Sequence, residues 1–313
     1  MTTKALICGS LAYDSIMVFE DHFKNHILPD KVHMLNVSFL VPHFNRDFGG
    51  CAGNIGYNFK LLGEEPLIVA AVGRDFEPYR QRLDRLGISR RYVRELEDCY
   101  TAQAFITTDL DDNQITAFHP GAMMRSHEIQ VKDAEAVDIA IVAPDGRDAM
   151  LQHAEQFAER GTPFIFDPGQ AMPLFDGKDL KRFIELANYV VVNDYESELV
   201  RERTGYAHHD IARRTDAFIV TRGGEGSTVH TLNEVIEIPA AKAEAVADPT
   251  GCGDAYRAGL LYGIGRELDW RTTGRIASLL GALKVAQKGP QNHEITLDEF
   301  AAKFEEEFGL AMQ

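Results

Sequence analysis

Residues 248–259 read Asp-Pro-Thr-Gly-Cys-Gly-Asp-Ala-Tyr-Arg-Ala-Gly, a stretch that joins a glycine turn, the start of a helix and a single carboxylate. Gly251 and Gly253 allow backbone conformations in which consecutive N–H groups point at one anion. Small and apolar residues then recur at helical spacing, so we expect the turn at the positive N-terminal end of a helix. Asp254 would lie beside a bound phosphate, where it could accept a proton from a substrate hydroxyl. Taken alone, the same residues also fit a tight turn in which Asp254 caps a helix.

A second glycine motif supports the phosphate-binding interpretation. Residues 48–54 read Phe-Gly-Gly-Cys-Ala-Gly-Asn, and apolar residues follow at helical spacing up to Gly63. With both motifs, the chain resembles the ribokinase-type (PfkB) family of small-molecule kinases. That family has a C-terminal signature Asp-Thr-x-Gly-Ala-Gly-Asp and an N-terminal pattern Gly-Gly-x-x-x-Asn. Pro249 and Cys252 depart from the signature, but Cys252 still offers its backbone N–H, so the departure bears mainly on packing and oxidation.

The resemblance implies how a phosphoryl group would be transferred. ATP would be the donor, and the backbone N–H groups of Gly251, Cys252 and Gly253 would form an anion hole for its γ-phosphate. Asp254 would be the base that takes the proton of the acceptor hydroxyl. A monovalent cation such as K⁺ near Asp248 activates several relatives, and the sequence leaves that question open here.

Two further motifs match the nucleotide side of the family. Asn193 and Glu196 fit an Asn-x-x-Glu motif whose polar groups organise water bound to Mg²⁺ around the triphosphate. The same two residues also have the spacing of a helix cap, and both roles can hold together. Thr221, Gly223 and Gly226 fit the family's Thr-x-Gly-x-x-Gly nucleotide loop.

The acceptor would be bound by residues at strand ends and in a lid, because ligands lie outside the carboxyl edge of a parallel sheet. The resemblance places a glycine, an asparagine and an aspartate on the acceptor hydroxyls. An amide after another strand could contact a base or sugar, or be a turn residue without a ligand. Two phenylalanines could flank a base or simply pack the lid. The expected acceptor contacts are Asp14, Gly50, Asn54, Phe105, Phe118 and Gln170.

The order of elements predicts an α/β fold, because strand and helix patterns alternate along most of the chain. The family resemblance implies that residues 1–313 form a single ribokinase-like domain with three α/β/α layers and a mostly parallel central sheet. A small β-sheet lid would come from residues 12–45 and 99–120. The predicted strands are 5–8, 67–72, 139–143, 164–167, 189–193 and 218–221, and the lid hairpin joins 103–108 to 114–118. The predicted helices are one around residues 79–86, followed by 150–159, 180–187, 196–203, 252–267, 271–288 and 297–308.

Composition excludes several classes of protein. The 313 residues are 45% hydrophobic, enough for a large core, and contain no unbroken apolar run long enough to span a membrane. A net charge of −16 argues against nucleic acid or an anionic membrane as a partner. Four scattered cysteines and a start without a signal-peptide pattern predict a cytoplasmic protein with reduced thiols. An exposed lid sheet would also allow a homodimer.

The sequence lacks the motifs of several other enzyme classes. The chain has no Gly-x-x-x-x-Gly-Lys-Ser/Thr run, no Gly-x-Gly-x-x-Gly after its first strand and no His-Glu-x-x-His. His208, His209 and Asp210 are expected in a solvated loop, and the lid histidines on the surface, rather than as metal ligands. Cys252 as a nucleophile ranks below the kinase hypothesis, because no motif supplies a partner histidine.

The acceptor is harder to predict than the reaction. Residues 5–41, 101–122 and 167–170 resemble bacterial adenosine-kinase-like nucleoside kinases more than ribokinase itself. We therefore expect an ATP-dependent kinase of adenosine or other purine nucleosides, of the kind that acts in purine salvage. A ribokinase- or fructokinase-like sugar kinase is the alternative, and a non-catalytic ligand sensor of the same fold is a further one. The intact Asp254 argues against the sensor.

Overall fold

The core is a nine-stranded sheet in the order β13-β12-β11-β10-β9-β8-β1-β4-β5. Neighbours from β5 to β11 pair in parallel, whereas β12 and β13 are antiparallel. The computed structural model describes residues 2–27, 33–34, 36–111 and 113–312. The strands are β1 (Lys4–Cys8), β4 (Glu65–Gly73), β5 (Ser89–Leu96), β8 (Ile139–Val142), β9 (Phe164–Phe166), β10 (Tyr189–Asn193), β11 (Ala217–Thr221), β12 (Ser227–His230) and β13 (Val235–Ile238). The central strands are continuous apolar runs because helices cover both faces of the sheet.

Helices form a layer on each side of this sheet. One buried cluster joins the sheet to α1 (Cys51–Leu61), α2 (Glu77–Leu86), α7 (Cys252–Gly265), α8 (Trp270–Val285) and α9 (Leu297–Phe308). The other joins it to α3 (Arg147–Arg160), α4 (Gly177–Leu186), α5 (Asp194–Thr204) and α6 (His208–Ala212). The three-layer α/β/α architecture is therefore confirmed. Among the described residues, no helix combines the length and the apolar character needed to cross a bilayer.

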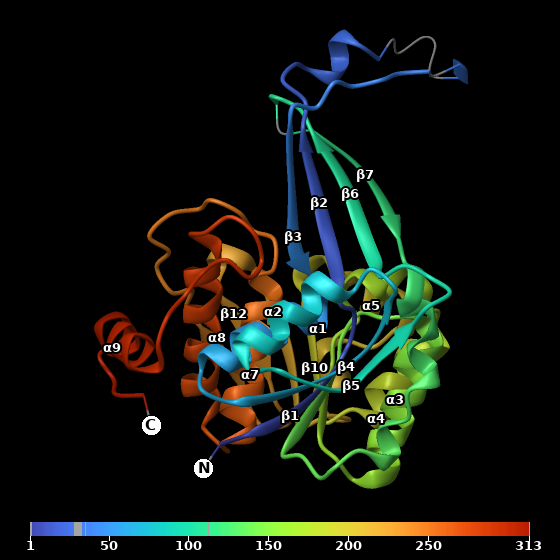
Figure 1. Cartoon of the computed structure of the whole chain (residues 1–313). Helices are drawn as coiled ribbons and strands as arrows, with labels where there is room; N and C mark the ends of the chain where they lie inside the picture. The colour runs from blue at the N-terminus through green and yellow to red at the C-terminus, as the bar shows by residue number, and fades with distance from the viewer. Residues whose placement is uncertain (1, 28–32, 35, 112, 313) are drawn as a thin grey trace.

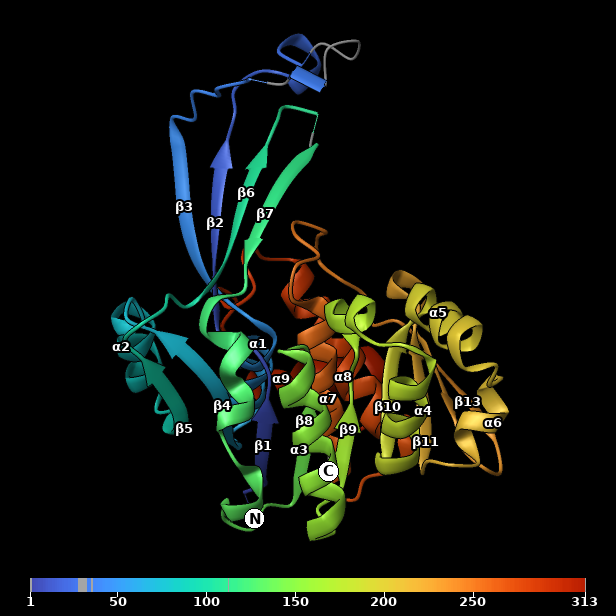
Figure 2. The same cartoon turned by 90° about the vertical axis from the view of Figure 1, so that its right-hand side faces the viewer.

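A separate four-stranded sheet forms the lid. Its order is β3-β2-β6-β7, from β2 (Ala12–Val18), β3 (His43–Gly49), β6 (Ala102–Thr108) and β7 (Gln114–His119). The lid rises above the α/β body, with both chain termini toward the opposite end (Figure 1). The view turned by 90° shows the same arrangement, with the lid strands running up from the body (Figure 2). A separate lid sheet with the predicted hairpin strands is confirmed, and β3 extends to Gly49, directly before α1. Residues 28–32, 35 and 112 of the predicted lid lie outside the described residues.

Several predicted element boundaries were wrong for identifiable reasons. Strand β5 escaped prediction because its sequence SRRYVREL is mostly polar, as expected at a sheet edge. The short strands β12 and β13 were also missed. Helix α8 ends at Val285 rather than at residue 288, since the N–H of Gln287 turns back to the backbone oxygen of Lys284 at 3.1 Å. His208, His209 and Asp210, predicted in a loop, begin the short helix α6.

Candidate active site

The turn before α7 leaves three backbone N–H groups without an acceptor among the described residues. Gly251 has φ +81°, and a Cβ there would lie 2.8 Å from the Cβ of Pro290, so only glycine fits this position. The N–H of Cys252 is used within the turn, since it donates to the backbone oxygen of Pro249 at 3.1 Å. In the described part of the chain, no acceptor contacts the N–H of Gly251, Gly253 or Asp254. The open donors at this helix start are therefore the N–H groups of Gly251, Gly253 and Asp254. Of the three expected amides, only that of Cys252 is already used within the turn.

Asp254 is held by an asparagine from a distant helix. Its Oδ2 accepts a hydrogen bond of 2.8 Å from Nδ2 of Asn54, which is buried in α1. The Nε2 of Gln291 donates to Oδ1 of the same asparagine at 3.0 Å, so the Asn54 amide has one orientation. Burial is the main cause that raises the pKa of Asp254 to about 7; Asp167 adds to the rise, and the Asn54 bond opposes it. Such a pKa suits a group that exchanges protons near neutral pH.

A buried ion pair lies one helical turn further along α7. Arg257 donates through Nε and Nη2 to the two carboxylate oxygens of Asp167, at 2.9 and 3.1 Å. Both residues are almost fully buried. Burial lowers the pKa of Arg257, but the charges of Asp167, Glu196 and Asp254 outweigh it and raise the pKa. Arg257 is therefore the positive charge among three carboxylates at this sheet edge. We did not predict this pair, although an arginine in an otherwise apolar helix was a usable signal.

Asn193 and Glu196 form the predicted helix cap. The Asn193 Oδ1 accepts from the N–H of Glu196, and the Glu196 Oε2 accepts from the N–H of Asn193, each at 2.8 Å. Burial raises the pKa of Glu196, and the nearby Asp167 carboxylate adds to the rise. The Oε1 of Glu196 accepts no hydrogen bond from the described residues. Because Mg²⁺ prefers carboxylate oxygens and keeps several waters, this oxygen fits water-mediated binding of the ion.

A mostly apolar cavity of about 360 Å³ adjoins the α7 start. It unites the predicted nucleotide loop with the glycine turn, since Thr221, Gly223, Gly226, Cys252 and Gly253 all line it. The loop needs glycine at 226, where φ is +86° and a Cβ would lie 2.1 Å from the backbone oxygen of Ile238. Segments thirty residues apart in the sequence thus form one pocket.

Of three expected acceptor residues, Gly50 lies directly before a helix, Asp14 lies within lid strand β2, and Gln170 follows β9. Gly50 precedes α1 with φ +86°, and a Cβ there would lie 2.5 Å from the backbone oxygen of Ser10. Asp14 is opposite Asp47 in the pairing of β2 with β3. Burial, Asp47 and Asp248 together raise the pKa of Asp14 to about 6. Gln170 is exposed after β9, and no hydrogen bond or ion pair to another described residue assigns it a role.

The two lid phenylalanines lie on opposite faces of the lid sheet, so only one of them shares a face with Asp14. Phe105 is opposite Ala117, whereas Phe118 is opposite Ala104. Since Ala104 is also the neighbour of Asp14 in the parallel pairing, Phe118 shares the face of Asp14 and Phe105 does not. Alternation along the strands was readable from the sequence, but the register between β2, β6 and β7 was not.

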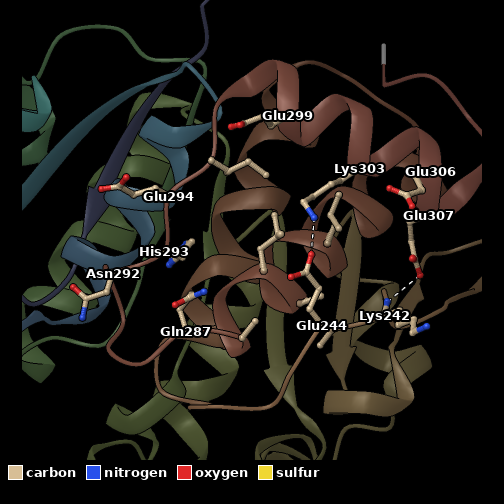
Figure 3. A pocket seen from close by; sticks show the side chains of 16 residues that line it. Lys242, Glu244, Gln287, Asn292, His293, Glu294, Glu299, Lys303, Glu306 and Glu307 are labelled. Atoms are coloured by element: carbon tan, nitrogen blue, oxygen red, sulfur yellow. Dashed lines mark hydrogen bonds and ion pairs between the residues drawn. The ribbon is translucent and has the colours of Figure 1, made fainter.

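A larger cavity lies beside this site, between α8 and α9, and is lined by many charged side chains (Figure 3). Its volume is about 630 Å³. Lys303 is paired with Glu244 at 2.7 Å, and the N–H of Lys242 donates to Glu307 at 2.9 Å. None of the described residues lining this cavity is one of the predicted site residues.

The rejected alternatives gain no support. Burial is the main cause that raises the pKa of the Cys252 thiol, whereas a nucleophilic cysteine needs a lowered one. The ring of His208 contacts Ser197 at 2.9 Å, and His209 pairs with its neighbour Asp210 at 3.3 Å. In the lid, His22 lies 2.9 Å from Asp111 and has no second histidine in its potential metal cluster among the described residues.

Comparisons with known proteins agree with this geometry. The pfkB family carbohydrate kinase model matches residues 9–297. The nucleoside kinase of Methanocaldococcus jannaschii is 35% identical over 277 residues, which cover 86% of this chain and 89% of that protein. A solved structure of Burkholderia thailandensis nucleoside kinase in complex with inosine is 55% identical, with a TM-score of 0.89, and covers 98% of this chain and 99% of that chain. A structure of the same enzyme in complex with ADP-inosine is 56% identical, with a TM-score of 0.87, and covers 98% and 97%.

Proposed function

This chain belongs to the pfkB family of carbohydrate kinases, and we propose that it is an ATP-dependent nucleoside kinase acting on the ribose 5′-hydroxyl of purine nucleosides. The observation that carries the proposal is the position of Asp254. Its carboxylate lies in the first turn of α7, oriented by Asn54 at 2.8 Å and adjacent to open backbone N–H groups. A proton acceptor and an anion site therefore share one helix turn, as phosphoryl transfer requires.

Each residue of the turn has a distinct task in this mechanism. Asp254 orients the acceptor hydroxyl and takes its proton as the phosphoryl group arrives. The N–H groups of Gly253 and Asp254, at the positive end of α7, stabilise negative charge on the transferred group. The flanking Gly251 gives the backbone the shape that presents these donors. Alignment and charge stabilisation supply most of the acceleration, because phosphoryl transfer has a loose transition state.

The donor nucleotide would occupy the apolar cavity between the 221–226 loop and α7. Thr221, Gly223 and Gly226 line it on one side, and Cys252 and Gly253 lie on the other. Glu196, with Asp167 nearby, would hold Mg²⁺ through water, and the ion would neutralise charge on the phosphates. The solved complex of the Burkholderia thailandensis enzyme with ADP-inosine supports the proposal that a nucleotide and a nucleoside are both ligands.

The nucleoside would lie under the lid on the face that carries Asp14. Asp14 and Asn54 would bind ribose hydroxyls, and Gly50 would let the sugar approach the backbone. Phe118, on the same lid face and 53% exposed, offers an aromatic surface on which a purine can stack. Closure of the lid would exclude water and limit hydrolysis of ATP.

A direct assay tests the reaction and the base together. MgATP-dependent phosphorylation is measured with adenosine, inosine, guanosine, cytidine, ribose and fructose, for the wild type and Asp254→Asn. We expect turnover on purine nucleosides and a loss of several orders of magnitude in the variant, with ATP affinity nearly unchanged. Turnover only on free sugars would transfer the assignment to a sugar kinase. Near-wild-type turnover in the variant would exclude Asp254 as the base, and folded wild-type protein that turns over no acceptor would favour the ligand sensor.

A further inference from the structure

Lys284 is a lysine with no exposed surface, at the inner side of the last turn of α8. Lysine is almost never fully buried without partners, because its ammonium group loses hydration that must be replaced. The groups around its Nζ atom must therefore replace the lost water, and they show what this site is built to bind.

The ammonium group is bound by backbone oxygens. Its Nζ donates to the backbone oxygen of Asp248 at 2.7 Å and to that of Gln287 at 2.9 Å. It also lies 3.9 Å from the carboxylate Oδ2 of Asp248. That carboxylate in turn accepts from the N–H of Thr250 and of Gly289, both at 2.8 Å. One positive charge thus ties the end of α8 to the segment that enters the glycine turn.

This oxygen cluster is the place where the family resemblance implies a monovalent cation. Carbonyl oxygens with a nearby carboxylate are suitable ligands for K⁺. Here the ammonium group of Lys284 already uses the backbone oxygens of Asp248 and Gln287. A second cation would lose these ligands and face repulsion from the lysine at short range. The residues around Asp248 therefore do not fit an additional K⁺ ion.

The positive charge of Lys284 lowers the pKa values of two neighbouring groups, Asp248 and His293. Burial raises the pKa of Asp248, but N–H donors from Thr250 and Gly289, together with the charge of Lys284, outweigh it and leave the pKa below its ordinary value. Burial and the same charge lower the pKa of His293 to about 4, so this histidine stays neutral. Gln287 and His293 both lie on the segment beyond α8 that Figure 3 shows from the side of the neighbouring cavity.

We infer that the ammonium group of Lys284 is a built-in replacement for the monovalent cation, and that it positions the 248–254 turn for phosphoryl transfer. The inference rests on the proposed kinase function. Lys284 is a positioning residue, because it contacts the backbone before the anion site and neither the phosphate nor Asp254. The N–H groups of Ala247 and Asp248 also donate to the backbone oxygen of Val285, at 2.8 and 3.1 Å, so the lysine completes an existing junction.

The first test needs no variant. Wild-type turnover of MgATP and a purine nucleoside is measured from zero to 100 mM K⁺, with tetramethylammonium holding the ionic strength constant. We expect turnover to be unchanged across the series. Stimulation by K⁺ of several-fold would overturn the inference while leaving the kinase function intact. If the wild type turns over no acceptor, the proposed function itself has failed.

Two variants test the role of the charge. Lys284→Ala removes the ammonium group and leaves space, and we expect kcat to fall about 100-fold, since small displacements of reacting groups cost this much. Added NH₄⁺ or K⁺ should restore part of kcat, whereas tetramethylammonium, which is too large, should not. Lys284→Met fills the same space without charge, so its kcat should stay low in every salt.

Thermal unfolding and circular dichroism of both variants show whether they are folded at the assay temperature, and the K⁺ series on the wild type decides the question if they are not. A folded Lys284→Met with wild-type kcat would refute the role. So would a folded Lys284→Ala in which no small cation restores activity.

Discussion

The pH dependence of turnover tests the assignment of Asp254 as the base. Burial, with a contribution from Asp167 and against the hydrogen bond of Asn54, raises the pKa of Asp254 from 3.8 to about 7. Only the carboxylate can accept the proton, and its fraction is about one half at pH 7 and about one tenth at pH 6. We therefore expect kcat/KM to fall about tenfold per pH unit below about pH 6.5 and to level off above about pH 8.

The assay is the initial rate of nucleoside phosphorylation at low nucleoside concentration and saturating MgATP, between pH 5.5 and 9. A second carboxyl group titrates nearby, because burial, Asp47 and Asp248 raise the pKa of Asp14 to about 6. Asp14→Asn is the matched control: its acceptor KM should rise while the fall in rate below pH 7 remains. A kcat/KM that is flat from pH 5.5 to 8 in the wild type would refute the reasoning.

The same pKa has an opposite consequence for stability. Between pH 4 and pH 7 the folded protein holds a proton on Asp254 that the unfolded chain has released, so stability falls as pH rises through this range. Asp254→Asn removes that loss. Its Tm should exceed that of the wild type at pH 8 and approach it at pH 4, as measured by thermal unfolding. An equal difference in Tm between the variant and the wild type at both pH values would show that folding does not raise the pKa of Asp254.

Three further variants test the site. Phe118→Ala should raise the nucleoside KM about fivefold or more with little change in the ATP KM, whereas Phe105→Ala, on the opposite lid face, should change neither; equal effects of the two variants would contradict the register. Asn54→Ala removes a hydrogen bond that lowers the pKa of Asp254, so the fall in kcat/KM should move to higher pH and the acceptor KM should rise; an unchanged pH profile and KM would count against the contact. Gly50→Ala places a Cβ at φ +86° against the backbone of Ser10 and should cost about 2–4 kcal/mol of unfolding free energy, read from denaturant unfolding; an unchanged midpoint would show that the backbone can adjust.

Much of the site was predictable because its signals are local. A glycine turn followed by helical spacing predicts a helix start with free N–H groups, and Gly251 has the positive φ that this turn requires. The Asn193 and Glu196 cap follows in the same way from two residues three apart. Continuous apolar strands that alternate with helices predicted a parallel sheet whose two faces are both covered by helices. Family resemblance, rather than spacing, supplied the acceptor residues and the lid.

The amino-acid sequence therefore predicts the local structures and the chemistry that each of them can present. Contacts between distant segments were decided only by the tertiary structure. Arg257 meets Asp167 across 90 positions, and Gln291 orients Asn54 across 237. Lys284 looks like an ordinary residue of a helix until packing buries it against the backbone oxygen of Asp248. The physical reason is that burial and pairing set the cost of a charge, and both depend on which segments the fold brings together.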